Sequence, residues 1–339
     1  MKESYSNKSK IHVRLKNFVK WIAPERDKRE QIKKQSDEIR SRIKSKAEDD
    51  ELTIQSMPYS GSFAKKTGLR RHFHGDHEIE GQDIDIPFVV QKGKETEFEP
   101  LISRFEGYAK SSYPSTERER TKSSIKMKFV GTKISYDLVP MFTTADPEKQ
   151  MLLRQNGDVI TTSIQKHKDF IRSRIKESDT AEGIVLFNEC IRLLKWWREV
   201  KVQEGKGYIE EVPSFLIDLL AAKAYDEVGV ETTYSQTLAV WFSFISSIIK
   251  KREAIWFKDF YRTPQLNSSH SWSVMDPVMP DNNITKNWVG YQIDELGQWF
   301  QEAAEEMNRA IVSDLLEDDV ASLESLKKIF GKIFQSHCD

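Results

Sequence analysis

The pattern of apolar positions divides the chain into two parts. Residues 83–90 alternate polar and apolar side chains and then become wholly apolar, which is typical of a strand that enters a core. Two further alternating runs, 124–130 and 134–139, flank a short turn that contains Gly131, and they predict a β-hairpin. The first half of the chain is therefore expected to contain a sheet.

From about residue 160 the apolar positions follow helical spacing instead. The predicted helices are 164–176, 182–202, 213–228, 234–250, 288–311 and 314–334. Near the N-terminus, residues 13–48 have the spacing of a long, half-exposed helix that is interrupted at Pro24, and their mixed charges indicate mainly a solvated face. The pattern predicts an α+β fold: an N-terminal lobe with a sheet and a C-terminal helical lobe.

Composition removes several classes of protein. With 339 residues, 38% hydrophobic, the chain has material for about two domains, and wholesale disorder is excluded. A formal net charge of −1 excludes a surface that binds nucleic acid nonspecifically as a whole. Two cysteines, Cys190 and Cys338, exclude a disulfide framework, and no apolar stretch reaches the roughly 18 residues of a bilayer helix. Because no secretion signal is visible either, a cytoplasmic protein without membrane contact is expected.

Three aspartates are the candidate centre of chemistry. Asp83 and Asp85 are two apart on one predicted strand, so both side chains leave the same face and repel unless a dication lies between them. Asp137 lies among apolar neighbours on another predicted strand, where an acid is costly unless it is paired or coordinated. If the two strands are neighbours, the carboxylates form a ligand set for two Mg²⁺ ions, with Mn²⁺ as a substitute.

Gly61 and Ser62 supply the complementary part. A Gly before a helix start lets backbone N–H groups approach a phosphate, and Ser62 can donate a hydroxyl hydrogen bond. A Gly-Ser pair alone is a weak signal, and an Asp-X-Asp alone is usually a solvated pair. Gly-Ser, then Asp-X-Asp on a strand, then a lone Asp on a hairpin strand is much more specific in that order.

These segments resemble a known family. The sequences GSFAKKT (61–67), DIDIPFVV (83–90) and ISYDLVP (134–140) resemble the nucleotidyltransferase signature of the polymerase-β-like superfamily, above all that of the bacterial CD-NTases. The resemblance implies a catalytic lobe with a central mixed sheet over residues 1–160, including the long N-terminal helix. It implies an all-helical, oligoadenylate-synthetase-like lobe over residues 161–339.

The helical lobe also carries pieces similar to the family. By that resemblance Lys195, in RLLKWW, and Ser214, in PSFL, would contact the donor phosphates, and Phe215 would stack on a base. The residues alone allow blander interpretations: a lysine reaching solvent from a core edge, a helix cap and an ordinary core aromatic. Residues 274–283 resemble the D-P-x-x-P-x-x-N segment beside the active-site cleft.

The resemblance implies a function. The chain would join ATP and a second NTP into a cyclic di- or trinucleotide messenger, which acts on a separate effector in CBASS anti-phage defence. Asp83 and Asp85 would hold both metals, and Asp137 would complete the one beside the acceptor hydroxyl. A regulatory protein is a further candidate partner, whereas no stable nucleic-acid partner is expected.

Other interpretations stay open at this point. The same metal motif would serve an enzyme that transfers nucleotides to an RNA end or to a protein side chain. A nucleotide-sensing or scaffold protein with a silent site is a second alternative, although all three acids are present.

One departure from the family is an inserted loop at 70–81, which contains three histidines. The spacing of His72, His74 and His77 with Asp76 fits no common zinc pattern, so a flexible insertion is expected.

Overall fold

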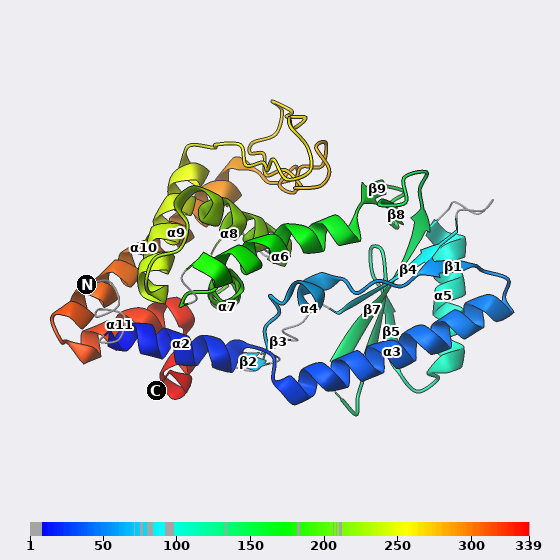
Figure 1. Ribbon diagram of the computed structural model, residues 1–339, viewed down its shortest axis with the longest axis horizontal. Helices are drawn as coiled ribbons and strands as arrows, with labels where there is room; N and C mark the ends of the chain where they lie inside the picture. The colour runs from blue at the N-terminus through cyan, green and yellow to red at the C-terminus, as the bar shows by residue number, and fades with distance from the viewer. Residues whose placement is uncertain are drawn as a thin grey trace. The chain divides into compact units, whose positions relative to one another are not determined.

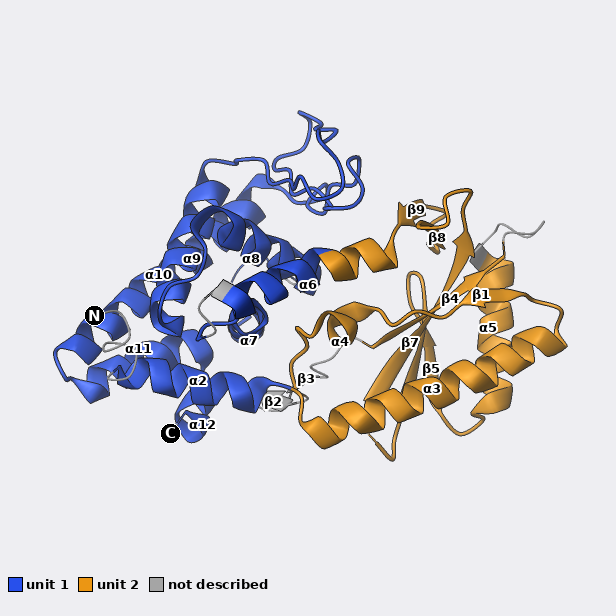
Figure 2. Ribbon diagram, viewed as in Figure 1, with its two compact units in different colours: residues 1–23, 170–339 blue, residues 24–169 orange. Residues whose placement is uncertain are grey.

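The computed structural model describes residues 9–70, 72–74, 77–79, 84–91, 98–132, 134–181, 184–205, 207, 209 and 212–338. The chain forms two compact units (Figure 2). The sheet unit comprises residues 24–169, and the helical unit comprises residues 1–23 together with 170–339. The expected lobes met near residue 160 and placed the N-terminal helix with the sheet. The observed boundary lies at residue 169, and the first part of the expected helix, residues 10–22, packs among the C-terminal helices. The remainder, residues 26–49, belongs to the sheet unit as expected.

The sheet unit is built on strands joined in the order β1-β4-β7-β6-β5, and β8 pairs with both β7 and β9 (Figure 1). The strands are β1 (Ile54–Ser56), β4 (Asp85–Val90), β5 (Glu117–Arg120), β6 (Ile125–Phe129), β7 (Ile134–Thr143), β8 (Gln150–Leu153) and β9 (Val159–Thr162). β4 and β7 run parallel, and the other pairs are antiparallel. The predicted hairpin is confirmed as β6 and β7.

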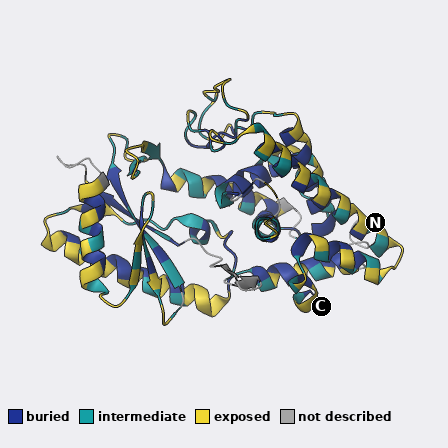
Figure 3. Ribbon diagram, turned by 180° about the vertical axis from the view of Figure 1, so that it is seen from behind, coloured by how far each residue is buried: buried dark blue, intermediate teal, exposed yellow. Residues whose placement is uncertain are grey.

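One face of this sheet packs against helices α3 (Arg26–Asp49) and α5 (Phe98–Ser112). Ile86, Phe88 and Val90 of β4 are fully buried in that core beside Leu138 of β7. Figure 3 shows buried and exposed positions along α3, as expected for a helix that covers a sheet on one side only. Because side chains alternate along a strand, the residues between these core positions face the opposite side.

A separate two-stranded antiparallel sheet lies in the region that was expected to be a flexible loop. β2 (His72–His74) pairs with β3 (His77–Ile79). The loop prediction is wrong for these six residues, because backbone pairing forms a hairpin from runs too short to show a clear alternation. Asp76 and residues 80–83 lie outside the described residues.

The helices predicted for the second half of the chain are confirmed. They are α6 (Ile164–Ala181), which crosses the boundary between the units, and α7 (Phe187–Gln203), α8 (Ser214–Val228), α9 (Tyr234–Lys250), α10 (Gly290–Leu315), α11 (Asp319–Phe330) and α12 (Ile333–His337) of the helical unit. The helical unit also contains α2 (Lys10–Ile22), from the start of the chain. The helix predicted over 314–334 is divided at Gly331, whose φ of 78° lies in the left-handed region that ends helices.

The N-terminal helix α2 is held by aromatic packing. Phe18 is fully buried, and its ring centroid lies 5.4 Å from that of Trp196 on α7 and 4.7 Å from that of Phe334 on α12. Pro24 lies between α2 and α3, so the chain leaves one unit for the other at the expected break. The apolar face of α2 therefore belongs to the helical core.

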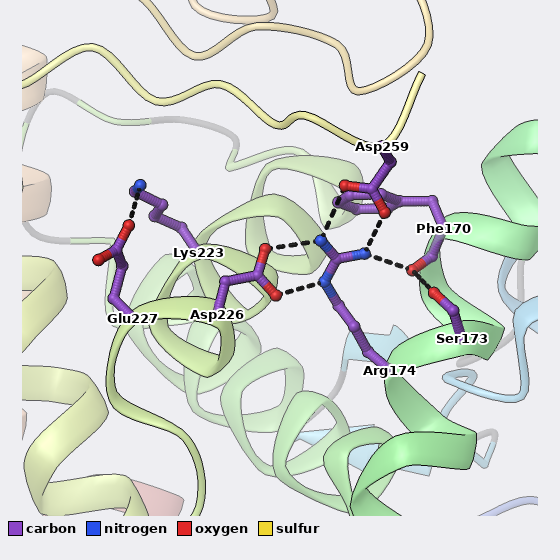
Figure 4. A network of polar contacts seen from close by, with 7 residues as sticks. All are labelled: Phe170, Ser173, Arg174, Lys223, Asp226, Glu227 and Asp259. Atoms are coloured by element: carbon purple, nitrogen blue, oxygen red, sulfur yellow. Dashed lines mark hydrogen bonds and ion pairs between the residues drawn. The ribbon is translucent and has the colours of Figure 1, made fainter. Parts of the chain in front are cut away.

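A buried arginine connects three segments of the helical unit (Figure 4). Arg174 of α6 forms paired hydrogen bonds of 2.7 and 2.6 Å with Asp226 of α8, and two of 3.0 Å with Asp259. Burial disfavours the guanidinium charge, but the hydrogen bonds to both carboxylates outweigh it and raise the pKa of Arg174. Asp259 belongs to the irregular segment between α9 and α10, which this arginine anchors to the helices.

Within the described part of the chain, every helix is too short or too polar to cross a bilayer.

The packing of α2 leads to a stability prediction. Phe18→Ala should lower the free energy of unfolding of the helical unit by about 3–5 kcal/mol, because it leaves a cavity among aromatic rings. Denaturant unfolding followed by tryptophan fluorescence measures this, since Trp196 adjoins the site. Val13→Ala on the same helix is the control: Val13 is 47% exposed, and a change within about 0.5 kcal/mol is expected. Equal effects of the two changes would contradict the placement of α2.

Candidate functional site

Two of the three predicted aspartates are direct neighbours. In the parallel β4–β7 pair Asp85 is the register partner of Asp137, and the Asp137 N–H donates to the Ile84 carbonyl over 3.1 Å. Adjacent strands lie about 4.8 Å apart, and register partners face the same side of a sheet. Both residues are half-buried. The prediction that the two strands are neighbours is confirmed, whereas Asp83 lies outside the described residues.

Strand β6 contributes the surroundings of Asp137. The Ser124 hydroxyl, just before β6, donates to Asp137 Oδ1 over 2.7 Å. Lys126 is the register partner of Asp137 on β6 and leaves the same face. Asp85, Asp137 and Lys126 therefore form a row across three neighbouring strands, opposite the face that packs on α3 and α5. Ser124 and Lys126 were not among the predicted site residues, although their alternation in the predicted hairpin places them on the face of Asp137.

The chemistry of this row suits a hard cation. Mg²⁺ is usually held by one or two carboxylates together with phosphate oxygens and water, and Asp85 and Asp137 provide two such ligands on one face. Among the described residues no group of three or more His, Cys, Asp or Glu side chains could hold a metal. Asp83, the third carboxylate of the predicted set, falls in the part that is not described.

The Gly-Ser loop is anchored on α3 by a buried arginine. Arg40 is 6% exposed; its Nε donates to the Met57 carbonyl over 3.2 Å, and its guanidinium lies 3.8 Å from the centre of the Tyr59 ring. Gly61 then begins α4 (Gly61–Lys65) with φ 71°, a conformation that a side chain would strain. Glycine is therefore favoured at position 61 because the backbone at the start of α4 adopts a positive φ.

Tyr59 completes this anchor. Burial, with the hydrogen bond to Asp37, raises the pKa of Tyr59 to about 12, so its hydroxyl stays protonated and donates to the Asp37 carboxylate. Ser62 follows on α4, where its side chain is 8% exposed and its carbonyl accepts the Thr67 N–H over 3.0 Å. The position of Ser62 is thus determined by contacts on both sides of the loop.

In the helical unit the structure gives Lys195 a partner that the sequence analysis did not name. Lys195 Nζ lies 2.7 Å from Asp218 Oδ1, and both side chains are no more than 3% exposed. Asp218 is one turn after Ser214, the first residue of α8, so the two share a helix face. Lys195 therefore does not extend to solvent. The available signal was an acid within the apolar run IDLLAA.

Phe215 and Ser214 begin α8 and are half-buried. The segment 274–283 is held by its own polar groups. Asp276, 3% exposed, accepts the N–H groups of Val278 and Met279 over 2.8 and 3.2 Å. The aspartate of the D-P-x-x-P-x-x-N segment therefore stabilises a turn.

The predicted site residues thus lie in both units. Gly61, Ser62, Asp85 and Asp137 belong to the sheet unit, and Lys195, Ser214 and Phe215 belong to the helical unit.

Comparison with known proteins supports the resemblance to bacterial nucleotidyltransferases that the sequence motifs indicated. Residues 10–177 match a family described as the Second Messenger Oligonucleotide or Dinucleotide Synthetase (SMODS) domain. The chain is 25% identical over 317 residues to a cyclic AMP-AMP-AMP synthase of Escherichia coli (strain MS 115-1), with 91% of each chain covered. It is 26% identical over 318 residues to a CBASS oligonucleotide cyclase, CdnC, of Escherichia coli (strain KTE188), covering 91% of this chain and 92% of that protein.

Two solved structures of CdnC from E. coli MS115-1 have the same fold. The structure with ATP has a TM-score of 0.78 at 23% identity and covers 96% of this chain and 99% of that one. The complex with HORMA-deltaN has a TM-score of 0.74 at 23% identity and covers 92% and 94%.

The chain belongs to the bacterial CD-NTase family. The predicted α+β, polymerase-β-like class is confirmed by the mixed sheet, the helices and these structural matches.

The arginine anchor of this CD-NTase leads to a prediction about the Gly-Ser loop. Arg40→Gln should accelerate amide exchange across residues 57–62 and lower the free energy of unfolding by about 1–3 kcal/mol, because the half-buried carbonyls of Met57 and Pro58 lose their donor. Hydrogen–deuterium exchange with mass spectrometry measures both local and global protection. The matched control is Lys44→Gln on the same helix: the Lys44 side chain is 44% exposed and forms an ion pair with Glu48. Unchanged exchange in Arg40→Gln would show that the loop does not depend on this anchor.

Proposed function

We propose that the chain is a metal-dependent cyclic oligonucleotide synthase that joins NTPs through successive nucleotidyl transfers. The observation that carries the proposal is the register of Asp85 with Asp137, which places two carboxylates side by side on one sheet face. The SMODS match and the CD-NTase relatives support the reaction class. The proposal favours nucleotide acceptors over an RNA end or a protein side chain.

The residues of the sheet unit have separate roles in this proposal. Asp85 and Asp137, with Asp83, would hold Mg²⁺ or Mn²⁺ through their carboxylate oxygens. When bound, the ions lower the pKa of the acceptor hydroxyl and neutralise the charge of the triphosphate and its leaving group. Ser62, placed by the anchored Gly-Ser loop, would donate a hydrogen bond to the triphosphate.

We propose phosphate contacts for two residues of the helical unit as well. Ser214 at the start of α8 would supply a hydroxyl, and Lys195, which pairs with Asp218 one turn further along α8, would supply an ammonium group. Asp218 would hold the ammonium in a defined orientation. Phe215 would stack on a base.

The names of the relatives favour a substrate and a context. One relative is named for making cyclic AMP-AMP-AMP, so we propose ATP as a substrate and a cyclic trinucleotide ahead of a dinucleotide. Another is named as a CBASS cyclase, which supports a role in anti-phage signalling through a separate effector. CdnC has been solved in complex with HORMA-deltaN, which supports a regulatory protein as a further partner.

The carboxylate pair provides the direct test. Asp85→Asn and Asp137→Asn should each reduce turnover of labelled NTPs with Mg²⁺ by about 10³-fold or more, because each removes a metal ligand and a compensating charge. The product of the wild-type enzyme should resist phosphatase, as a ring without a free terminal phosphate does, and mass spectrometry of a four-NTP reaction identifies its bases and size.

The control for this test is Asp169→Asn, an exposed aspartate of α6 that hydrogen-bonds to Gln165. It should retain wild-type turnover. Wild-type rates in Asp85→Asn and Asp137→Asn would refute the metal assignment. Label that appears only on added RNA or protein would replace the cyclase proposal with the alternative acceptors.

The Lys195–Asp218 pair separates a structural role from nucleotide binding. Lys195→Met alone should cost about 3–5 kcal/mol of stability, because Asp218 loses its cation inside the unit. The double change Lys195→Met/Asp218→Leu should restore stability, since well-packed apolar side chains often replace a buried pair without loss. If Lys195 contacts phosphate, the stable double variant should still have a KM for ATP roughly tenfold to a hundredfold higher, as for one charge-assisted hydrogen bond.

Thermal unfolding and steady-state kinetics on the same preparations provide the two readouts. If the double variant has wild-type stability and a wild-type KM, Lys195 does not bind phosphate, and its role is the structural one of joining α7 to α8.

A further inference from the structure

The turn that precedes β6 ends in a hydrogen-bond chain directed at Asp137. Ser124 is 5% exposed, and its hydroxyl donates to Asp137 Oδ1 over 2.7 Å. The hydroxyl oxygen of Thr121 lies 2.7 Å from that of Ser124. The Thr121 oxygen also accepts the Ser124 backbone N–H over 3.0 Å, and the Thr121 N–H donates to the Ser124 carbonyl over 2.9 Å. The turn therefore holds Ser124 through its backbone and its side chain.

The donors and acceptors give this chain one direction. An ionised carboxylate can only accept, so the single hydroxyl proton of Ser124 is directed at Asp137. The Ser124 oxygen must then accept at the 2.7 Å contact with Thr121, so Thr121 donates its proton there rather than to the more distant Ser124 carbonyl at 3.3 Å. The order is Thr121 to Ser124 to Asp137, and each hydroxyl both donates and accepts.

The geometry of the face explains why such a chain is useful. Asp85 and Asp137 are adjacent like charges, and each would turn its carboxylate away from the other if nothing held it. A hydrogen bond to one oxygen of Asp137 limits rotation of the carboxylate about its Cβ–Cγ bond. Because Ser124 is neutral, it does this without changing the net charge of the face.

We propose that Ser124 is a positioning residue of the nucleotidyl transfer: it holds the Asp137 carboxylate in the orientation that binds the divalent cation, and Thr121 in turn orients Ser124. This inference rests on the function proposed above. Groups that orient metal-binding carboxylates typically change metal affinity or activity by about 10–100-fold when they are removed.

The test compares Ser124→Ala with Ser124→Thr, which keeps the hydroxyl, and with Ser123→Ala, which removes the neighbouring hydroxyl instead. Binding of Mn²⁺ to the full chain with a non-hydrolysable ATP analogue is measured by electron paramagnetic resonance. The metal concentration for half-maximal synthesis and the midpoint of thermal unfolding are measured on the same preparations.

Ser124→Ala should weaken Mn²⁺ binding and raise the half-maximal metal concentration by about tenfold or more. Ser124→Thr and Ser123→Ala should remain close to wild type. Saturating metal should recover part of the lost rate in Ser124→Ala, a recovery that general loss of structure would not permit.

A second variant covers the case in which Ser124→Ala fails to fold. Ser124→Cys keeps the approximate size of the side chain but has a weaker donor, so its metal affinity should fall between those of wild type and Ser124→Ala. Wild-type Mn²⁺ affinity in a folded Ser124→Ala or Ser124→Cys protein would overturn the positioning role.

Asp85→Asn distinguishes this failure from failure of the proposed function. If Asp85→Asn loses Mn²⁺ binding and Ser124→Ala does not, only the role of Ser124 is rejected. If Asp85→Asn also binds and turns over like wild type, the metal site itself is rejected.

Discussion

The parallel pairing of β4 with β7 is the constraint on which the candidate site depends. It places Asp85 beside Asp137 at a backbone spacing that the hydrogen-bonded ladder sets, so the two residues cannot separate without breaking the centre of the sheet. The same alternation that directs both acids to one face directs Ile86 and Leu138 to the other, against α3 and α5. Burial of the core on one face thus keeps two carboxylates side by side on the other. Their mutual repulsion is offset when cations bind them or when hydrogen-bond donors contact them.

Polar contacts at the edges of the core position further groups of the candidate site. Arg40 fixes the loop before Gly61 from α3, and Ser124 holds one oxygen of Asp137 from the turn before β6. In the helical unit, buried ion pairs perform a comparable task, since Arg174 joins α6 to α8 and Lys195 joins α7 to α8. Such pairs add little net stability but strongly favour one arrangement, because each charge is costly to leave buried without its partner.

Local sequence patterns predicted those elements whose periodicity is undisturbed. The β6–β7 hairpin and helices such as α9 follow directly from alternation or helical spacing. The helix α5 was not predicted, and the expected insertion contains the β2–β3 pair. The sequence also could not predict that α2 packs in the helical unit. An amphipathic pattern shows that a helix has an apolar face but not which core that face joins.

By itself the sequence determined the candidate ligands of a metal site: aspartates on predicted strands, and a glycine before a short helix. Their order along the chain carried the resemblance that implied the reaction class. Tertiary structure alone decided which groups meet. The register of Asp85 with Asp137 and the pairing of Lys195 with Asp218 join residues that are distant in sequence. Strand order and helix packing, which bury the apolar faces together, set these two contacts, and no local pattern encodes them.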